Sequence, residues 1–265
     1  MALHIALDGV DGVGKTTMIT KLKEYLMSKS YNVKTLTQPG FNPIISILKD
    51  YNLTIPEKEL LLAADRSITF NQENFEEYDV VLWDRCILTS YAYHTDETIK
   101  SPFIRNINKF SPEMDLIIVI THYEYTQEQN FSNRVCYDLI GKYDELIREF
   151  SNVFEVKYLP DDPTGVLDKI VEIIFSELPT CRWCGKLFRK SVFNKKYCCD
   201  KCKKFAKEEQ NRDNFRNYYN RYKDTMSESK KGALGSKGAN LHGRANKDPE
   251  VEARLINREK MRLGL

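Results

Sequence analysis

The sequence predicts an α/β fold in which a parallel sheet carries helices on both faces, followed by a small cysteine-rich unit. Three observations in the 265 residues lead to this expectation. Short apolar runs alternate with longer helical patterns up to residue 178. A glycine-rich turn joins the first apolar run to the first helical pattern, and five of the seven cysteines lie between residues 181 and 202.

The apolar runs give the expected order of elements. Buried strands are predicted where short apolar segments recur, at residues 3–7, 32–37, 79–83, 116–120 and 153–158. Helices are predicted between and after them, at residues 15–28, 57–74, 127–150 and 162–178. Because nearly continuous apolar strands that alternate with helices are typical of sheets covered on both faces, we expect a parallel sheet.

The composition changes after Pro179-Thr180. Residues 1–180 hold 17 Lys and Arg against 28 Asp and Glu, whereas residues 181–265 hold 23 against 10. This asymmetry indicates units with different partners. We expect a sheet domain over residues 1–178, a metal-binding unit with a basic helix over 181–223, and a flexible basic tail over 224–265 that contains a short helix at 250–262.

The glycine-rich turn matches a phosphate-binding loop and thereby predicts a P-loop NTPase fold. The segment Gly9–Thr16 fits G-x-x-x-x-G-K-[S/T] between a predicted strand and a predicted helix. In such a loop, backbone N–H groups and the helix N-terminus face phosphate oxygens. We expect Lys15 to reach the β- and γ-phosphates of ATP and Thr16 to take a Mg²⁺ position. The nucleotide-binding residues are expected to be Gly9, Asp11, Gly12, Val13, Gly14, Lys15, Thr16 and Thr17.

Asp84 and Arg85 follow a predicted apolar strand directly. The carboxyl edge of a parallel sheet is where ligands bind, so Asp84 is expected to hold Mg²⁺, directly or through water. Arg85 is expected to bind the phosphate of the acceptor with its planar guanidinium group. Together with Lys15, these two residues are the predicted catalytic groups.

Four segments resemble the thymidylate kinase family, in that family's order. They are Asp8–Thr17, Leu60–Arg66, Asp84-Arg85 with Thr89–His94, and Pro112–Asp115 ahead of a strand. The resemblance covers residues 1–178 and implies an ATP- and Mg²⁺-dependent deoxynucleoside monophosphate kinase that prefers dTMP and forms a homodimer. It also implies acceptor contacts from Arg66 to the base or phosphate, from Asp11 to the sugar 3′-hydroxyl, from Tyr93 to the sugar and from Arg85 to the phosphate.

The sequence departs from the family pattern at three places. Thr37 replaces an arginine that would bind the acceptor phosphate, and Leu62 replaces an aromatic residue that would stack on the base. The family carries a catalytic arginine in the phosphate loop or in a lid, but the loop position is Gly12 and Thr121–Asn133 contains no Arg or Lys. Losing such an arginine costs on the order of 10³–10⁵ in rate. The alternative function is therefore a nucleotide sensor with weakened catalysis, whose tail binds DNA or RNA.

The clustered cysteines predict a metal site. Two CxxC pairs supply four thiolates for tetrahedral Zn²⁺, and a unit this small depends on metal for its folding energy. The unit resembles treble-clef or ribbon-like zinc fingers, which implies the ligands Cys181, Cys184, Cys198 and Cys202. Spacing alone also allows Cys199 in place of Cys198. An iron–sulfur cluster or a set of reduced, metal-free cysteines are the alternatives.

A basic stretch with interleaved aromatic residues follows the cysteines. It contains Lys203, Lys204, Lys207, Arg212, Arg216, Arg221 and Lys223, with Phe205, Phe215, Tyr218, Tyr219 and Tyr222. Lysine and arginine attract phosphates and aromatic rings stack on unpaired bases, so the expected partner is DNA or RNA. The alternative is a structural finger whose basic helix packs on the acidic domain.

No apolar run approaches the roughly 18 residues of a membrane span. The N-terminus also lacks the basic stretch and long apolar stretch of a signal peptide. CxxC pairs without a secretion signal favour metal over disulfides. We therefore expect a cytoplasmic protein without a membrane partner.

Overall fold

The computed structural model describes residues 2–94, 101–122, 133–189, 194–222 and 224, with the backbone alone at 122 and 133–138. The chain divides into two compact units, Met1–Leu178 and Pro179–Leu265. Of the tail expected over 224–265, residues 225–265, with the short helix, lie outside the described residues, as do residues 127–132 of one predicted helix.

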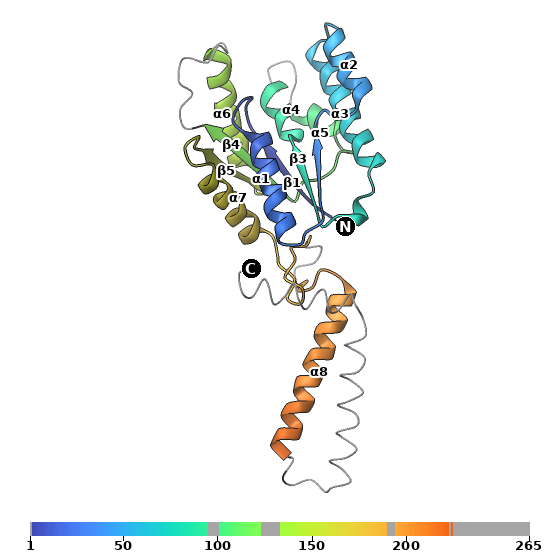
Figure 1. Ribbon diagram of the computed structural model, residues 1–265. Coiled ribbons are helices and arrows are strands. Elements are labelled where there is room, and N and C mark those ends of the chain that lie inside the picture. The colour runs from blue at the N-terminus through green and yellow to red at the C-terminus, as the bar shows by residue number, and fades with distance from the viewer. Residues whose placement is uncertain (1, 95–100, 123–132, 190–193, 223, 225–265) are drawn as a thin grey trace. The chain divides into compact units, whose positions relative to one another are not determined.

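The first unit is built on a five-stranded sheet (Figure 1). Its strands are β1 (Leu3–Asp8), β2 (Val33–Thr37), β3 (Val80–Asp84), β4 (Leu116–His122) and β5 (Val153–Tyr158). They lie in the order β2-β3-β1-β4-β5, and every pairing is parallel. The predicted parallel sheet is confirmed, and all five of its strands were expected near these positions.

Helices cover the sheet on both sides (Figure 1). Helix α1 (Lys15–Ser28) packs against α7 (Pro163–Glu177), whereas α4 (Ile87–His94) packs against α3 (Ile55–Gln72), α5 (Ser101–Ile107) and α6 (Asn133–Glu149). Helix α2 (Asn42–Asp50) and a short 3₁₀ turn at Phe75–Glu77 are the other described helical elements of the first unit. The sequence did not indicate α2, α4 or α5, because helices of seven to nine residues are too short to show a clear period.

Helix α3 begins at Ile55, two residues before the predicted start. Its first turn is closed by a capping box. The backbone N–H and the hydroxyl of Thr54 both donate to the Glu57 carboxylate at 2.7 Å, and Pro56 is preorganised for a first helical turn. This start determines the register of the face that α3 presents to the interior.

The central strand β1 is buried along its whole length between β3 and β4. Its residue Leu7 lies opposite Asp84, so β1 and β3 end side by side at the carboxyl edge of the sheet. Trp83 is fully buried one residue before this edge, and its indole N–H donates to His4 Nδ1 at 3.1 Å. The turn after β1 therefore begins beside the end of β3, where parallel sheets bind ligands.

The second unit has a small core of cysteine and aromatic side chains. Cys181, Trp183, Cys184, Phe188 and Cys202 are buried together. Thr180 and Leu187 form an antiparallel bridge, and a long helix, α8 (Asp200–Tyr222), begins just after Cys199 and carries Cys202 in its first turn. Among the described residues, no helix is both long enough and apolar enough to cross a membrane.

Candidate functional site

The loop between β1 and α1 has a conformation that requires glycine. Gly9, Gly12 and Gly14 have φ values of 135°, 82° and 88°, in the region that side chains disfavour. A Cβ on Gly9 would lie 2.4 Å from the Ile120 backbone oxygen, and one on Gly14 would lie 2.9 Å from the Tyr158 ring. The loop is therefore pressed against the ends of β4 and β5, as a phosphate cradle beside a sheet edge requires.

Lys15 crosses this loop. Its side chain is buried, and Nζ donates to the Val10 carbonyl oxygen at 2.7 Å. Burial, reinforced by the positive charge of Arg85, lowers the pKa of Lys15, while Asp8, Asp11 and Asp84 act in the opposite direction. A phosphate oxygen can replace the Val10 carbonyl as the acceptor and would supply the negative charge that favours the ammonium form.

Thr16 and Asp84 face each other across the start of α1 and the end of β3. The Thr16 hydroxyl donates to Asp84 Oδ2 at 2.7 Å, and Asp84 is 8% exposed. A hydroxyl and a carboxylate that meet at the sheet edge are the oxygen donors that Mg²⁺ prefers. The two predicted magnesium residues are thus adjacent, and their chemistry fits the ion.

Arg85 adopts a left-handed backbone conformation, with φ of 74°. This conformation is strained for a residue with a side chain. Its backbone N–H donates to the Leu7 carbonyl at 3.0 Å, and its guanidinium pairs with Asp11 and lies 5.8 Å from the centroid of the Tyr93 ring. Burial opposes the charge of Arg85, but Asp11 and then Asp8 outweigh it, so its pKa is raised. Three predicted acceptor residues, Asp11, Arg85 and Tyr93, therefore meet at one side of the loop.

Asp8 organises the surroundings of the loop, a role that sequence reasoning missed. Its fully buried carboxylate accepts hydrogen bonds from Gly9 N–H at 2.8 Å, from the Thr89 hydroxyl at 2.7 Å and from the Tyr143 hydroxyl at 2.8 Å. The backbone N–H of Cys86 donates to it at 3.1 Å. The loop, α4 and α6 are thus held by one carboxylate. An acidic residue that directly follows an apolar strand and precedes a glycine was the available signal.

Arg66 is buried rather than exposed on its helix. It is 3% exposed and donates to Gln38 Oε1 at 3.2 Å, Asn108 Oδ1 at 2.7 Å and Ser90 Oγ. Burial lowers its pKa, and the nearest carboxylates, Glu59 first among them, oppose that shift. All three hydrogen-bond partners are neutral, so no ion pair with them would have to break if the guanidinium met an anionic or polar ligand.

The turn after β2 is held by Asp65, which precedes Arg66 on α3. Its carboxylate accepts from the backbone N–H groups of Gly40 at 3.0 Å and Phe41 at 2.7 Å. Burial raises the pKa of Asp65 despite these bonds. Neighbouring residues of one motif thus serve two tasks, since Asp65 shapes the turn and Arg66 points to the interior. Most of the expected lid, Thr121–Asn133, lies outside the described residues.

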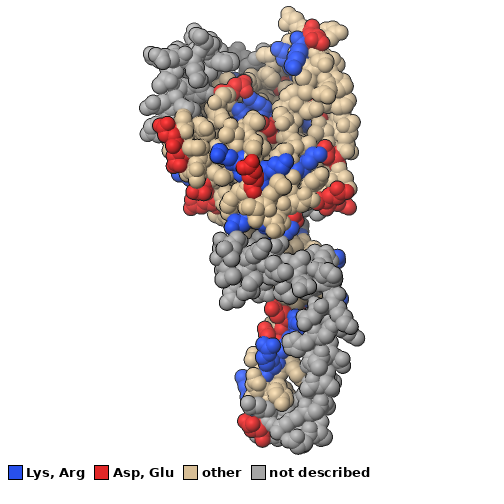
Figure 2. Space-filling model, viewed as in Figure 1, with Lys and Arg blue, Asp and Glu red and all other residues tan. Residues whose placement is uncertain are grey.

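The face of the first unit that Figure 2 shows carries acidic and basic side chains interspersed with one another. At the loop itself, Lys15 and Arg85 carry positive charge that can attract a phosphate.

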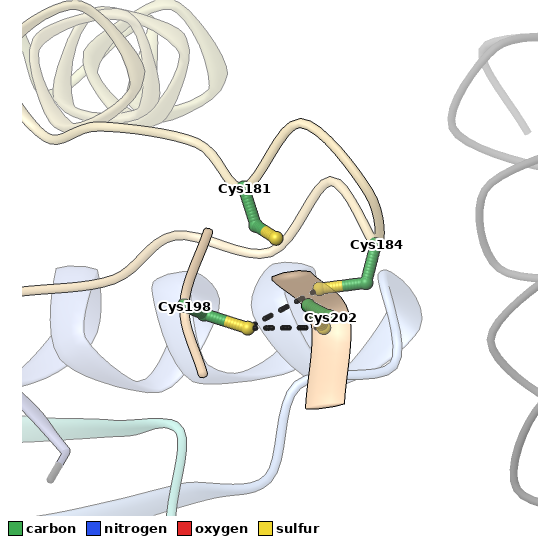
Figure 3. A group of neighbouring side chains, drawn as sticks. All are labelled: Cys181, Cys184, Cys198 and Cys202. Atoms are coloured by element: carbon green, nitrogen blue, oxygen red, sulfur yellow. Dashed lines mark hydrogen bonds between the residues drawn. The ribbon is translucent and has the colours of Figure 1, made fainter. Parts of the chain in front are cut away.

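The second unit brings four cysteines together (Figure 3). The sulfur atoms of Cys181, Cys184, Cys198 and Cys202 all lie within 4.8 Å of one another, with 3.6 Å between Cys184 and Cys198 and 3.4 Å between Cys198 and Cys202. A tetrahedral site with Zn–S bonds of about 2.3 Å needs sulfur separations of roughly 3.8 Å. Cys199 is exposed and is not one of the four.

Two local features shape the cysteine cluster. Gly185 has φ of 73° and donates its N–H to the Cys181 carbonyl at 2.8 Å, which closes the first knuckle. Hydrogen bonds from the other three thiols lower the pKa of Cys181, so the cluster favours a thiolate there.

The centroid of the Trp183 ring lies 6.1 Å from that of the Phe205 ring. Phe205 therefore belongs to the small core, although the sequence suggested it for base stacking.

The basic stretch lies on α8 up to Tyr222, and Lys223 lies outside the described residues. Tyr218 and Tyr222 are exposed, with ring centroids 4.9 Å apart, near the end of α8. A surface cavity of about 800 Å³ lies beside the cysteines, and it is lined by Asn194, Lys195, Lys196, Tyr197, Cys198, Cys199, Asp200 and Lys203. Lysines and a tyrosine on one cavity suit a phosphate backbone with an unpaired base.

Comparison with known proteins gives consistent matches. A family model described as thymidylate kinase matches residues 7–135. A probable thymidylate kinase of Methanosphaera stadtmanae is 35% identical over 130 residues, which cover 44% of this chain and 66% of that protein. One of Sulfolobus acidocaldarius is 31% identical over 159 residues, which cover 58% of this chain and 80% of that protein.

A solved structure gives the same result for the fold. The crystal structure of thymidylate kinase from Ehrlichia chaffeensis matches with a TM-score of 0.55 and 21% identity, over 65% of this chain and 98% of that one. At this identity the match concerns the fold alone, and it agrees with the predicted P-loop architecture.

Proposed function

Because the chain belongs to the thymidylate kinase family, we propose that it transfers the γ-phosphoryl group of ATP to a deoxynucleoside 5′-monophosphate, with dTMP preferred. One observation carries this proposal. The glycine loop, Lys15, the Thr16–Asp84 pair and the Arg85–Asp11 pair meet at the carboxyl edge of β1 and β3. That arrangement supplies a phosphate cradle, a divalent-cation site and a cation for the acceptor.

The donor side follows from the loop geometry. Backbone N–H groups and the Lys15 ammonium bind the β- and γ-phosphates, while the burial of Lys15 keeps competing water away. The Thr16 hydroxyl and the Asp84 carboxylate would hold Mg²⁺, which when bound neutralises charge on the phosphate oxygens. An oxygen of the acceptor phosphate attacks the γ-phosphorus, the bond to the β–γ bridging oxygen breaks, and ADP leaves.

The acceptor side is formed by residues around Arg85. We propose that Arg85 binds the acceptor phosphate once its contact with Asp11 loosens, and that Asp11 then accepts from the sugar 3′-hydroxyl. The Tyr93 ring, already beside Arg85, lies against the sugar. Buried Arg66, bonded only to neutral side chains, reaches the base or the phosphate. These groups orient the two phosphates, which supplies much of the catalysis in phosphoryl transfer.

The test is ADP formation from ATP with each deoxynucleoside monophosphate in turn. Turnover with dTMP exceeds that with the other acceptors, and Lys15→Ala reduces it to background. Lys23→Ala, on the same helix but away from the loop, leaves it unchanged. ATP binding without turnover for any acceptor would favour the sensor function, which Gly12 in place of a loop arginine makes the second candidate.

For the second unit we propose a Zn²⁺ site made by Cys181, Cys184, Cys198 and Cys202, with DNA or RNA bound along its lysines. The four converging sulfurs and the lysine-lined cavity support this proposal. Elemental analysis of the full chain is expected to give one zinc per protein. Substituting Lys203, Lys204 and Lys207 with alanine in the full chain should weaken nucleic-acid binding and flatten its salt dependence. An unchanged affinity would reject the nucleic-acid partner.

The remaining expectation concerns assembly. The family resemblance implies a homodimer formed through helices, and the sedimentation coefficient of the full chain tests it. If the chain is a monomer at micromolar concentration, any arginine that replaces the one absent from the phosphate loop must come from the same chain.

A further inference from the structure

A layer of buried polar side chains lies between α3 and α4. On α3, Glu59 and Arg66 are both buried and stand seven residues apart, on one face of the helix. On α4, Ser90 and His94 stand four residues apart and meet them in the reverse order, as in two helices that run in opposite directions. Arg66 donates to Ser90, and Glu59 Oε1 contacts His94 Nδ1. The Glu59–His94 pair is therefore one level further along the same interface that holds Arg66.

This interface is incomplete as it stands. Among the described residues, two buried side-chain atoms have no hydrogen-bond partner, and they are Gln38 Nε2 and Glu59 Oε2. Gln38 uses its other amide atom to accept from Arg66, and Glu59 exerts the largest favourable charge effect on Arg66. Buried polar atoms are rarely left unpaired, because they lose their water without compensation. Both unpaired atoms belong to the surroundings of one residue, which points to a ligand that completes them.

The sequence changes next to Glu59 point the same way. Leu62 lies one turn after Glu59 on α3 and replaces the aromatic residue by which the family stacks on the acceptor's base. A leucine supplies apolar contact but no ring to stack on the base. Recognition of the base must then rest more on hydrogen bonds, and Glu59 offers a buried acceptor with an unpaired oxygen one turn from Leu62.

We propose that Glu59, oriented by His94, is a specificity-determining residue that accepts a hydrogen bond from an N–H group on the base of the acceptor nucleotide. The inference rests on the proposed function, since it takes the base to lie beside Arg66. Glu59 is fully covered while the His94 side chain is 20% exposed, so the base approaches from the His94 side.

The chemistry of Glu59 Oε2 restricts the group that the base presents to it. A carboxylate oxygen only accepts, so it favours an N–H and repels a bare carbonyl or ring nitrogen. Thymine, uracil and guanine offer a ring imino N–H, and cytosine, adenine and guanine offer an exocyclic amino group. A base that places none of these groups at Glu59, or a thymine whose imino N–H is blocked by methylation, would leave the buried carboxylate unpaired and be rejected.

The experiment measures equilibrium binding of acceptors to the full chain by calorimetry. The probes are dTMP, N3-methyl-dTMP, which lacks the imino N–H, and dCMP. The variants are wild type, Glu59→Gln, and Glu76→Gln as an isosteric control on an exposed glutamate. We expect Glu59→Gln to weaken dTMP binding about 10- to 100-fold while leaving N3-methyl-dTMP, already weak, unchanged. Loss confined to dCMP would instead assign the amino group as the donor.

Two outcomes would overturn the inference: equal weakening of all three ligands, which indicates a structural role, or no weakening of any. His94→Gln is a second variant, expected to weaken the same ligand by a smaller factor, and retained ATP binding shows that each variant is folded. Turnover is scored separately. Turnover without Glu59 dependence removes this inference but keeps the kinase, whereas Glu59-dependent binding without turnover removes the kinase activity alone.

Discussion

The loop site of the first unit and the cysteine cluster of the second are held in place by different forces. Around the loop, a buried carboxylate, Asp8, accepts donors from three elements that the sheet already brings together. In the second unit, five buried residues form the small core, and three of them are among the four clustered cysteines. The first site is therefore organised by the fold, whereas in the second the clustered cysteines themselves form most of the core.

The largest expected difference concerns metal removal. Chelation of zinc, or Cys184→Ser, should unfold the second unit, because zinc supplies on the order of 10 kcal/mol to units of this kind. The first unit should keep its ATP affinity, since none of its described loop contacts involves these cysteines. Amide hydrogen exchange resolved by peptide checks both expectations. Cys199→Ser is the control and should leave zinc content and exchange unchanged; loss of zinc in that variant would make Cys199 a ligand.

The next effect tests whether Asp8 organises the loop. Asp8→Asn keeps the size but cannot accept all of the hydrogen bonds that the carboxylate takes from Gly9, Thr89 and Tyr143. We expect a loss of about 2–4 kcal/mol in the unfolding free energy of the first unit, measured by urea denaturation. Zinc content should not change. The control is Asp50→Asn, at an exposed position, and equal stability of the two variants would contradict the role of Asp8.

A smaller effect concerns the charge of Lys15. Its pKa is lowered, mainly by burial, so the empty loop disfavours the ammonium form. The resulting penalty is present at neutral pH and disappears as pH rises from the lowered value to the usual range near 10.5. Lys15→Met should therefore abolish ATP binding yet raise the Tm of the nucleotide-free first unit by about 2–4 °C at pH 7.

The pH dependence of this gain in Tm shows whether it comes from the charge of Lys15. The gain in Tm from Lys15→Met should shrink as pH increases from 7 towards 10, because wild type then loses its buried charge. Differential scanning calorimetry at several pH values measures it. A gain that stays constant or grows with pH would show that the methionine acts through packing rather than charge.

The smallest effect is expected on exposed α8. Arg216 is largely exposed and only 3.9 Å from Asp213, a pair of little energetic value. Arg216→Gln should change stability by less than about 0.5 kcal/mol and leave zinc content unchanged. If α8 contacts nucleic acid through this residue, the slope of log affinity against log salt should decrease by roughly 1. An unchanged slope would show that Arg216 does not contact nucleic acid and would favour a contact at the lysines nearer the cysteines.

Features that depend on a short contiguous stretch of sequence were predictable, whereas contacts between residues far apart in the chain were not. The loop Gly9–Thr16 and the CxxC spacings are local patterns with one physical meaning each. The role of Asp8 depends on Thr89 and Tyr143, which lie 81 and 135 residues further along the chain. The Glu59–His94 contact similarly joins two helices, one of which was too short to be predicted.

Spacing along the sequence left open whether Cys198 or Cys199 is the third cysteine of the cluster, and the structure distinguishes them. Cys198 and Cys199 are adjacent in sequence, so either fits a CxxC-like pattern. Just before the start of α8, Cys198 meets Cys184 and Cys202, whereas Cys199 is exposed. Chain direction at a helix start, which composition does not encode, makes this distinction.

The chain has two tryptophans, and each unit holds one beside its site. Trp83 precedes Asp84 and donates its indole N–H to His4, and Trp183 lies within the cysteine core. Intrinsic fluorescence can therefore be divided between the units by replacing either ring with phenylalanine. One emission band then reports events at the sheet edge and the other reports the state of the cysteines, so ligand occupancy in either half can be followed optically in the intact chain without an added label.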